Sequence, residues 1–312
     1  GEVDVWNAGL SRRTVEVAAG HEIQMTRVIC VGVATLDIVN RVREYPPEDS
    51  EVRALAQYRR TGGNAANTAL VLAQLGHRVA WVGNLGQPCE TAEHEFARHG
   101  VDISNAVRIV GKPMPTSYIL LSEATGSRSI VHYRDLPEYS AADFCRLDLR
   151  EFDWVHFEGR ATDQLAAMLR RARETPGIYV SLEVEKPRPG IEDLFGYVDL
   201  LLFSRDYARA KGFVDAPGLL QSLPPGSVAS CTWGASGAWA VDREGQMHHA
   251  PASRLETVVD TVGAGDVFNA GMIQAMGRQL PLREALEQSV SLAGAKCAQN
   301  GVVSVPSRGS AR

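Results

Sequence analysis

Two aspartates and two glycines lie within seven residues of each other in the stretch Asp260-Thr261-Val262-Gly263-Ala264-Gly265-Asp266. Glycine lets the backbone come close to a ligand, and the unpaired N–H groups of a first helical turn bind anions such as phosphate. Asp266 stands next to this turn and could accept a proton from a hydroxyl group. Phosphoryl transfer to an alcohol requires both parts. The stretch could instead be a helix start whose aspartates only cap backbone donors.

The residues on either side of this stretch predict a strand, a turn and a helix. Val258 and Val259 are β-branched and favour a strand before the turn. After the turn, apolar residues recur at about helical spacing, namely Val267, Phe268, Ala270, Ile273 and Met276. The glycines therefore fall at a helix start, and we interpret Asp260 as structural.

A second polar helix start is predicted at Gly62-Gly63-Asn64-Ala65-Ala66-Asn67. Asn64 is a good N-cap, and Asn67, three residues later, lies on the same helix face. Gly76 ends the apolar pattern that follows. Two amides beside paired glycines could hold the hydroxyl groups of a ligand, although small residues at a helix start could also serve packing alone.

Two further aspartates follow the first predicted strand. Residues 27–33 are apolar and predict a buried parallel strand, with Asp37 where that strand would end. Residues 38–61 are polar and partly alternating, include Asp49, and do not predict a crossover helix. Ligands gather at the carboxyl ends of parallel strands, so both aspartates are candidates for binding. The alternative is a pair of loop carboxylates in water.

A hairpin is predicted by the alternating residues 117–121 and 129–133, which flank a turn at residues 124–127. Arg128 lies beside this turn. It could reach an anion, or it could be an ordinary arginine on a strand surface.

A regular alternation of strands and helices begins at Trp154. Strands are predicted at residues 178–184, 200–204 and 228–233, with a helix at residues 164–175. This alternation predicts an α/β fold with a doubly wound, mostly parallel central sheet flanked by helices. A glycine-rich turn at residues 232–238 and a last helix at residues 282–299 complete the chain.

The composition excludes several other classes of protein. The 312 residues are 45% hydrophobic, and 32 Lys and Arg against 37 Asp and Glu give a net charge of 32 − 37 = −5. With no dense basic run, nucleic acid is not an expected partner, and no apolar run is long enough to span a membrane. We therefore expect a soluble cytoplasmic protein. Residues 1–24 show no sustained period, and we treat them as an N-terminal extension or tag that is loosely ordered.

Other catalytic and metal-binding patterns are missing. Five scattered cysteines support neither disulfides nor a cysteine metal site, and no H-E-x-x-H zinc motif occurs. The sequence also lacks a P-loop, a complete G-x-G-x-x-G and a G-x-S-x-G elbow. Of the catalytic chemistries considered, phosphoryl transfer that uses glycine turns and carboxylates is the one that the sequence still supports.

The D-T-x-G-A-G-D stretch resembles the C-terminal signature of the ribokinase-like (PfkB) carbohydrate kinases, and the resemblance extends along nearly the whole chain after Met25. Within that family it narrows to the ketohexokinase (fructokinase) group. The narrower match is carried by residues 36–37, 45–51, 62–67, 157–160, 180–188, 194–197 and 203–206. Ser204-Arg205-Asp206 stands where most ribokinase-like enzymes have N-x-x-E, and the ketohexokinases share this loss.

The resemblance implies a domain plan and a role for each candidate residue. Residues 25–312 would form one kinase domain, with a small β-sheet lid from about residues 38–61 and 113–135. The ketose hydroxyls would be held by Asp37, Asp49, Gly63, Asn64 and Asn67. Asp266 would be the catalytic base, the N–H groups of Gly263, Ala264 and Gly265 would stabilise the transferred phosphoryl, and Arg128 would reach over from the lid.

The resemblance also implies ATP and Mg²⁺, and it leaves a requirement for a monovalent cation such as K⁺ open. The nucleotide would be lined by Thr232, Trp233, Gly234, Gly237 and Cys297. Glu183 and Glu185 are candidates for the metal's water shell because they alternate on one strand face, although a solvated pair with Lys186 and Arg188 is an equal alternative.

The expected activity is an ATP-dependent transfer of phosphate to a primary hydroxyl of a ketose, D-fructose to fructose 1-phosphate first, by a homodimer joined through its lids. Ser127 replaces an Asn of the animal ketohexokinases, and Gly234 to Gly237 replace acidic residues, so the preferred sugar could differ. The alternatives are another PfkB-family kinase, acting on ribose, a nucleoside or another fructose hydroxyl, and a non-catalytic sugar- or nucleotide-binding regulator.

Overall fold

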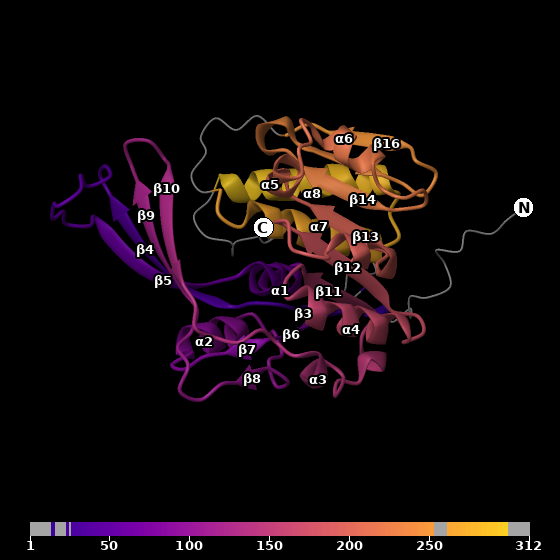
Figure 1. Ribbon diagram of the computed structural model, residues 1–312, viewed down its shortest axis with the longest axis horizontal. Coiled ribbons are helices and arrows are strands. Elements are labelled where there is room, and N and C mark those ends of the chain that lie inside the picture. Colours follow the sequence, from indigo (N-terminus) through magenta and orange to yellow (C-terminus); the bar gives the residue numbers. More distant parts are fainter. Residues whose placement is uncertain (1–13, 16–22, 25, 253–260, 299–312) are drawn as a thin grey trace, which may run out of the picture.

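An eight-stranded, mostly parallel sheet forms the centre of the protein (Figure 1). The computed structural model describes residues 14–15, 23–24, 26–252 and 261–298. The strand order is β16-β15-β14-β13-β12-β11-β3-β6, and only the pairs β14–β15 and β15–β16 are antiparallel. The strands are β3 (Arg27–Val31), β6 (Arg78–Val82), β11 (Trp154–Glu158), β12 (Tyr179–Val184), β13 (Leu200–Phe203), β14 (Ala229–Thr232), β15 (Ala238–Val241) and β16 (Met247–Ala250).

Helices cover both faces of this sheet, which is why its inner strands are apolar on both sides. One core joins the sheet to α1, α7 and α8, and the other joins it to α4, α5 and α6. The helices are α1 (Asn64–Gln74), α2 (Glu90–Arg98), α3 (Ala141–Phe144), α4 (Thr162–Arg173), α5 (Arg205–Ala210), α6 (Ala216–Gln221), α7 (Ala264–Gly277) and α8 (Leu282–Cys297), with 3₁₀ turns η2 (Leu149–Glu151), η3 (Glu192–Tyr197) and η4 (Gly234–Ser236). No helix among the described residues is long and apolar enough to cross a membrane.

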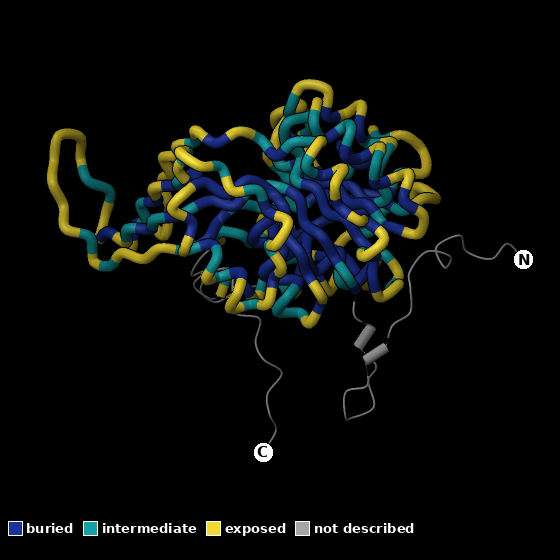
Figure 2. The backbone as a smooth tube through the Cα atoms, turned by 90° about the horizontal axis from the view of Figure 1, so that it is seen from below, coloured by how far each residue is buried: buried dark blue, intermediate teal, exposed yellow. Residues whose placement is uncertain are grey.

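A separate four-stranded sheet, here called the side sheet, projects from this body (Figure 1). Its strands are β4 (Thr35–Val42), β5 (Ala56–Gly62), β9 (Thr116–Ser122) and β10 (Arg128–Tyr133), in the order β10-β9-β4-β5. The two hairpins are antiparallel, but β4 and β9 pair in parallel. Its far end is largely exposed (Figure 2).

Most predicted elements are present, and some differ. The helix predicted at residues 164–175 corresponds to α4, and the hairpin of β9 and β10 is confirmed. Asp37 lies inside β4 rather than in a loop after β3. Asn64 is the first residue of α1, whose N-cap is Gly63 with no side-chain bond, so the predicted Asn64 cap is wrong. A glycine at this position lets β5 turn directly into the helix.

Two pairs of short strands complete the described structure. Two-stranded pairs are formed by β1 (Thr14–Val15) with β2 (Ile23–Gln24) and by β7 (Asn84–Leu85) with β8 (Val107–Arg108). The rest of residues 1–24 lies outside the described residues. The predicted strand at Val258 and Val259 and the structural role of Asp260 also lie outside them.

Candidate active site

A hydrogen bond between two helices joins the two polar stretches singled out in the sequence. Asn67 Nδ2 donates to Asp266 Oδ2 at 2.7 Å, across 199 residues of chain. Asp266 is only 5% exposed and lies in the first turn of α7. Its carboxylate therefore faces α1 instead of capping its own helix. Burial raises the pKa of Asp266 well above the usual range of an aspartate. The hydrogen bond from Asn67 acts in the opposite direction, and the charge of Glu185 raises the pKa further.

Two glutamates of β12 and its end join the same group from the sheet. Asn269, one turn after Asp266, donates to Glu183 Oε1 at 3.1 Å, and Asn64 donates to Glu185 Oε2 at 3.1 Å. Burial and the neighbouring Asp266 raise the pKa of Glu183 well above its ordinary value. Glu183 is therefore buried rather than solvated, whereas Glu185 is partly exposed and also lies 3.7 Å from Lys186 Nζ.

Gly63 occupies a position where only glycine fits. Its φ is 97°, and a Cβ there would lie 2.2 Å from the carbonyl oxygen of Val33. This close approach sets the start of α1 against the segment that follows β3. The direction of Asn64 and Asn67 depends on it.

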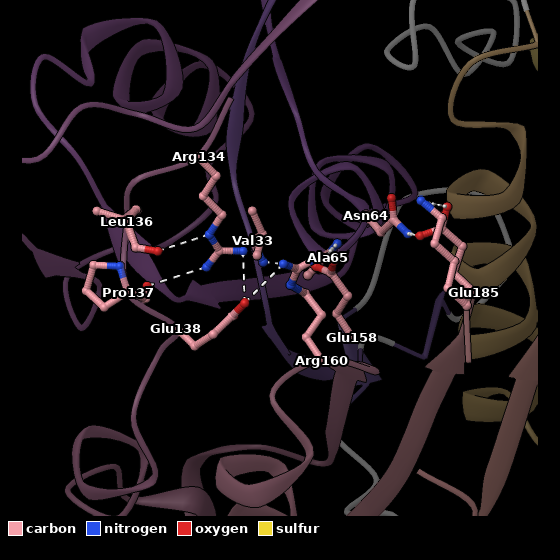
Figure 3. Close-up of polar contacts among 11 residues, drawn as sticks. Val33, Asn64, Ala65, Arg134, Leu136, Pro137, Glu138, Glu158, Arg160 and Glu185 are labelled. Carbon is pink, nitrogen blue, oxygen red and sulfur yellow. Dashed lines mark hydrogen bonds and ion pairs between the residues drawn. The ribbon is translucent and has the colours of Figure 1, made fainter. Parts of the chain in front are cut away.

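Glu158 is a site residue for which the sequence predicted no role. It ends β11, and its Oε2 accepts the Val33 N–H at 2.9 Å and the Ala65 N–H at 3.5 Å (Figure 3). Burial raises the pKa of this carboxyl. Glu158 therefore connects the end of β3 with the start of α1. A glutamate at the end of a predicted strand gives no signal in the sequence that it will contact these two backbone N–H groups.

An arginine pair continues from Glu158 toward the side sheet (Figure 3). Arg160 Nη2 and Arg134 Nη1 each lie 3.0 Å from Glu138 Oε1, and Arg160 Nη1 lies 3.8 Å from Glu158 Oε1. Burial alone would raise the pKa of Glu138, but the hydrogen bond from Arg160 and the nearby arginine charges lower it below its ordinary value. Every cation of this network has a carboxylate partner.

Asp37 lies at the base of the side sheet, next to the site. It is 7% exposed, accepts a hydrogen bond from Thr35 Oγ1 at 2.9 Å, and lies 3.8 Å from Arg60 Nε. A Cβ on Gly62 would come within 2.3 Å of its carboxylate. Asp37 is therefore a buried, oriented group rather than a loop carboxylate in water.

Asp49 lies far from Asp37 and the other site residues of the same chain. It is exposed, with φ 57°, in the connection between β4 and β5. The pairing of these strands runs from Thr35 opposite Gly62 at the base to Arg41 opposite Ala56, and Asp49 lies beyond that far end. The side sheet thus separates it from Asp37.

The turn before α7 leads into the helix through a left-handed glycine. Gly263 is the N-cap of α7 in this conformation, and the Ala264 N–H donates to the Thr261 carbonyl at 3.3 Å, so one of the three N–H groups expected to bind the phosphoryl already has a backbone acceptor. Among the described residues, no atom outside the local backbone lies within 4 Å of where a Gly265 Cβ would be. Arg128 of the side sheet donates from Nη1 to Thr261 Oγ1 at 2.7 Å. An arginine and a helix start therefore approach each other here.

A second glycine turn follows β14, at the same edge of the central sheet. Thr232 ends β14, the Trp233 N–H bonds the Gly237 carbonyl at 2.7 Å, and Gly234 has φ 59°. A Cβ on Gly237 would lie 2.0 Å from the Ala250 carbonyl oxygen, so glycine is required. Cys297 is the last residue of α8 and is half-buried; α8 packs on β15 and β16, which follow this turn.

The sequence matches the pfkB family carbohydrate kinase over residues 25–308. It is 37% identical over 289 residues to mouse ketohexokinase, covering 88% of this chain and 97% of that protein. It is 28% identical to an ATP-dependent ribose-1-phosphate kinase of Halopiger xanaduensis, covering 90% and 95%. The fold is similar to ribokinase from Cryptococcus neoformans var. grubii in complex with ADP, with TM-score 0.71, 18% identity, and 88% and 95% of the chains covered.

These comparisons confirm the resemblance seen in the signature and the fold class that was predicted. The protein is a phosphotransferase that acts on a sugar hydroxyl. The chain belongs to the PfkB family of carbohydrate kinases.

Proposed function

We propose that this protein transfers the γ-phosphate of ATP to a primary hydroxyl of a ketose, with D-fructose to fructose 1-phosphate as the first candidate. The Asn67–Asp266 hydrogen bond carries this proposal, because it places the proposed acceptor helix against the proposed catalytic turn. The similarity to mouse ketohexokinase supports the ketose, and the similarity to an ATP-dependent ribose-1-phosphate kinase supports ATP.

Each described group has a task in the proposed reaction. The acceptor hydroxyls are bound by Asp37, Asn64 and Asn67, since a sugar hydroxyl both donates and accepts. The hydroxyl oxygen forms a bond to the γ-phosphorus while the bond from that phosphorus to the bridging oxygen breaks, and ADP leaves. Asp266 takes the hydroxyl proton. The open start of α7 holds the negative charge of the transferred group.

The charges around the acceptor favour a neutral sugar. Arg60, Arg160 and Lys186 each lie within 4.0 Å of a carboxylate, which offsets the positive charge of each. The burial that raises the pKa of Asp266 and Glu183 would also disfavour the charge of a phosphate on the acceptor. The site therefore fits a free ketose better than a sugar phosphate such as ribose 1-phosphate.

The Mg²⁺ expected with ATP fits this site. Within the described residues, no group of three or more His, Cys, Asp or Glu could hold a metal ion. Mg²⁺ that arrives with a nucleotide needs only one or two carboxylates besides the phosphates. Glu183 Oε2 is buried without a hydrogen-bond partner in the described structure, and Glu183 with Glu185 would hold the ion through water. Bound Mg²⁺ would neutralise phosphate charge.

A coupled assay of ADP release tests the function. We would compare fructose, tagatose, ribose, adenosine and ribose 1-phosphate with a reaction lacking acceptor, and then locate the new phosphate ester by NMR. Fructose should give the highest kcat/KM and fructose 1-phosphate. If none of these acceptors stimulates ADP release, the protein is a binding regulator and not a kinase. Repeating the assay without Mg²⁺ or K⁺ tests each ion.

Replacing Arg128 by Ala should lower kcat about tenfold to a hundredfold and change the KM for the acceptor little. Its guanidinium lies beside the turn that would hold the transferred phosphoryl, so it would act mainly on charge that develops there. Steady-state kinetics against both substrates measure this split. An unchanged kcat would refute the role, and Arg98→Ala, an exposed arginine on α2, serves as the control.

We also propose that two copies associate through their side sheets, which then act as lids. Tyr118 and Val131 are paired neighbours that are 51% and 70% exposed, and Tyr133 on the same face is 57% exposed. A second side sheet would cover this apolar face. Asp49 could then serve an acceptor site only in the other copy, since it lies far from its own Asp37.

Light scattering should find a dimer for the natural chain. Tyr118→Glu should shift it toward monomer, since a charge would be buried in the interface. Val214→Glu, at an apolar residue that is 87% exposed away from the side sheet, should remain dimeric. A natural chain that is monomeric at assay concentration would contradict this proposal.

A further inference from the structure

We infer that Arg205 binds the phosphate chain of the nucleotide, at the diphosphate that ATP and ADP share. This inference rests on the proposed ATP-dependent activity and names a residue to which neither the sequence patterns nor the proposed mechanism gave a role.

The topology places Arg205 beside the second glycine turn. β13 and β14 are parallel neighbours, with Phe203 opposite Cys231, so the residues that follow these two strands meet at one edge of the sheet. A Cβ on Gly234 would lie 3.0 Å from Arg205 Nη1 and 3.7 Å from its Cζ. The guanidinium therefore lies against the backbone of the turn, with no side chain between them.

This guanidinium has no anionic partner in the part of the chain that the structure describes. Its Nε is shielded from water without a hydrogen-bond acceptor. Arg160 and Arg134, at the acceptor end, both lie next to Glu138. A shielded N–H without an acceptor is costly, and a bound anion would remove that cost.

The start of α5 holds Arg205 in place. Ser204 caps the helix by accepting the Tyr207 N–H at 3.0 Å, and its hydroxyl donates to the Glu185 carbonyl at the end of β12. One turn later, the Arg209 guanidinium lies 5.6 Å from the centre of the Trp233 ring. Two arginines of one short helix therefore contact the same turn, and Arg205 is positioned before a ligand arrives.

A phosphate chain is the anion that best matches this position. A planar guanidinium can bind two phosphate oxygens at once, as a lysine cannot. The start of α7 and Arg128 are assigned to the transferred phosphoryl, so Arg205, at a different turn, contacts the part that remains in ADP. Such a contact is equal in the bound nucleotide and in the transition state, and it should therefore affect nucleotide affinity more than kcat.

Calorimetric titration with ADP tests this assignment. In Arg205→Gln, the Kd for ADP should rise about tenfold to a hundredfold, whereas kcat at saturating ATP should stay within about threefold. Arg205→Lys keeps the charge without the paired donors, and its Kd for ADP should lie between those of the natural protein and Arg205→Gln. Raising the salt concentration should weaken ADP binding more in the natural protein than in Arg205→Gln. Arg170→Gln, at an exposed arginine on α4, is the control and should bind ADP normally.

The outcomes separate the two levels of the proposal. If the natural protein does not bind ADP, the proposed ATP-dependent function fails before any variant is compared. If it binds ADP and Arg205→Gln binds it within about twofold, the inference is overturned. Equal losses in the Gln and Lys variants, together with a lower Tm in both, would show that Arg205 only stabilises the fold and would also overturn it.

Discussion

Asp266→Asn should lower turnover by about a thousandfold or more while ADP binds with nearly unchanged affinity. A general base contributes about 10²- to 10⁴-fold, and an amide cannot take the hydroxyl proton. The substitution keeps the size of the side chain and an oxygen that can accept the hydrogen bond from Asn67. Turnover is measured by ADP release, and affinity by calorimetry.

The matched control is Asp163→Asn, which removes the only acidic residue in the first turn of another helix, α4, at an exposed position. It should retain full activity, because Asp163 contacts no group of the site. If the Asp266 variant turned over at a rate near that of the control, Asp266 would not be the base.

Gly63→Ala should lower kcat/KM for the acceptor by about a hundredfold or more. The new Cβ would lie 2.2 Å from the Val33 carbonyl oxygen, and a φ of 97° is strained for alanine. The start of α1 must therefore move, and it carries both asparagines of the site. A displacement of about 1 Å in a positioning group costs about 10²-fold in rate. Steady-state kinetics with the acceptor varied at saturating ATP measure the loss.

Gly76, next to the other end of α1, provides a control that separates strain from collision. Its φ is 92°, but in the described part of the chain no atom beyond its immediate neighbours lies within 4 Å of where its Cβ would be. Gly76→Ala should therefore lower the free energy of unfolding by about 1 to 3 kcal/mol and leave kinetics with the acceptor unchanged. Equal kinetic losses in the two variants would mean that general destabilisation, and not the approach to Val33, explains the effect at Gly63.

The local elements of this protein could be predicted from its sequence. The helix at residues 164–175, the β9–β10 hairpin and the helix after Gly263 follow from spacing and turn residues, because neighbours in the chain decide those conformations. The signature around Asp266 and the resemblance along the chain also predicted the family. All of this information lies within short windows of sequence or in the pattern of a known family.

The environment of each site residue was decided by the tertiary structure. The bond from Asn67 to Asp266 spans 199 residues and exists because α1 and α7 pack on the same face of the sheet. Burial of Asp37 follows from the pairing of β4, and the contact of Glu158 with Val33 from the neighbouring β3 and β11.

Asp37 and Asp49 show the same division most clearly. Asp37 follows the first predicted strand and Asp49 follows the Pro46-Pro47 pair, and neither position shows in the sequence whether its carboxylate reaches the site. The register of β4 with β5 buries the first at the base of the side sheet and leaves the second exposed beyond its far end. A sequence determines which residues can do chemistry, but the order and register of strands decide which of them meet, because those contacts join segments that are distant in the chain.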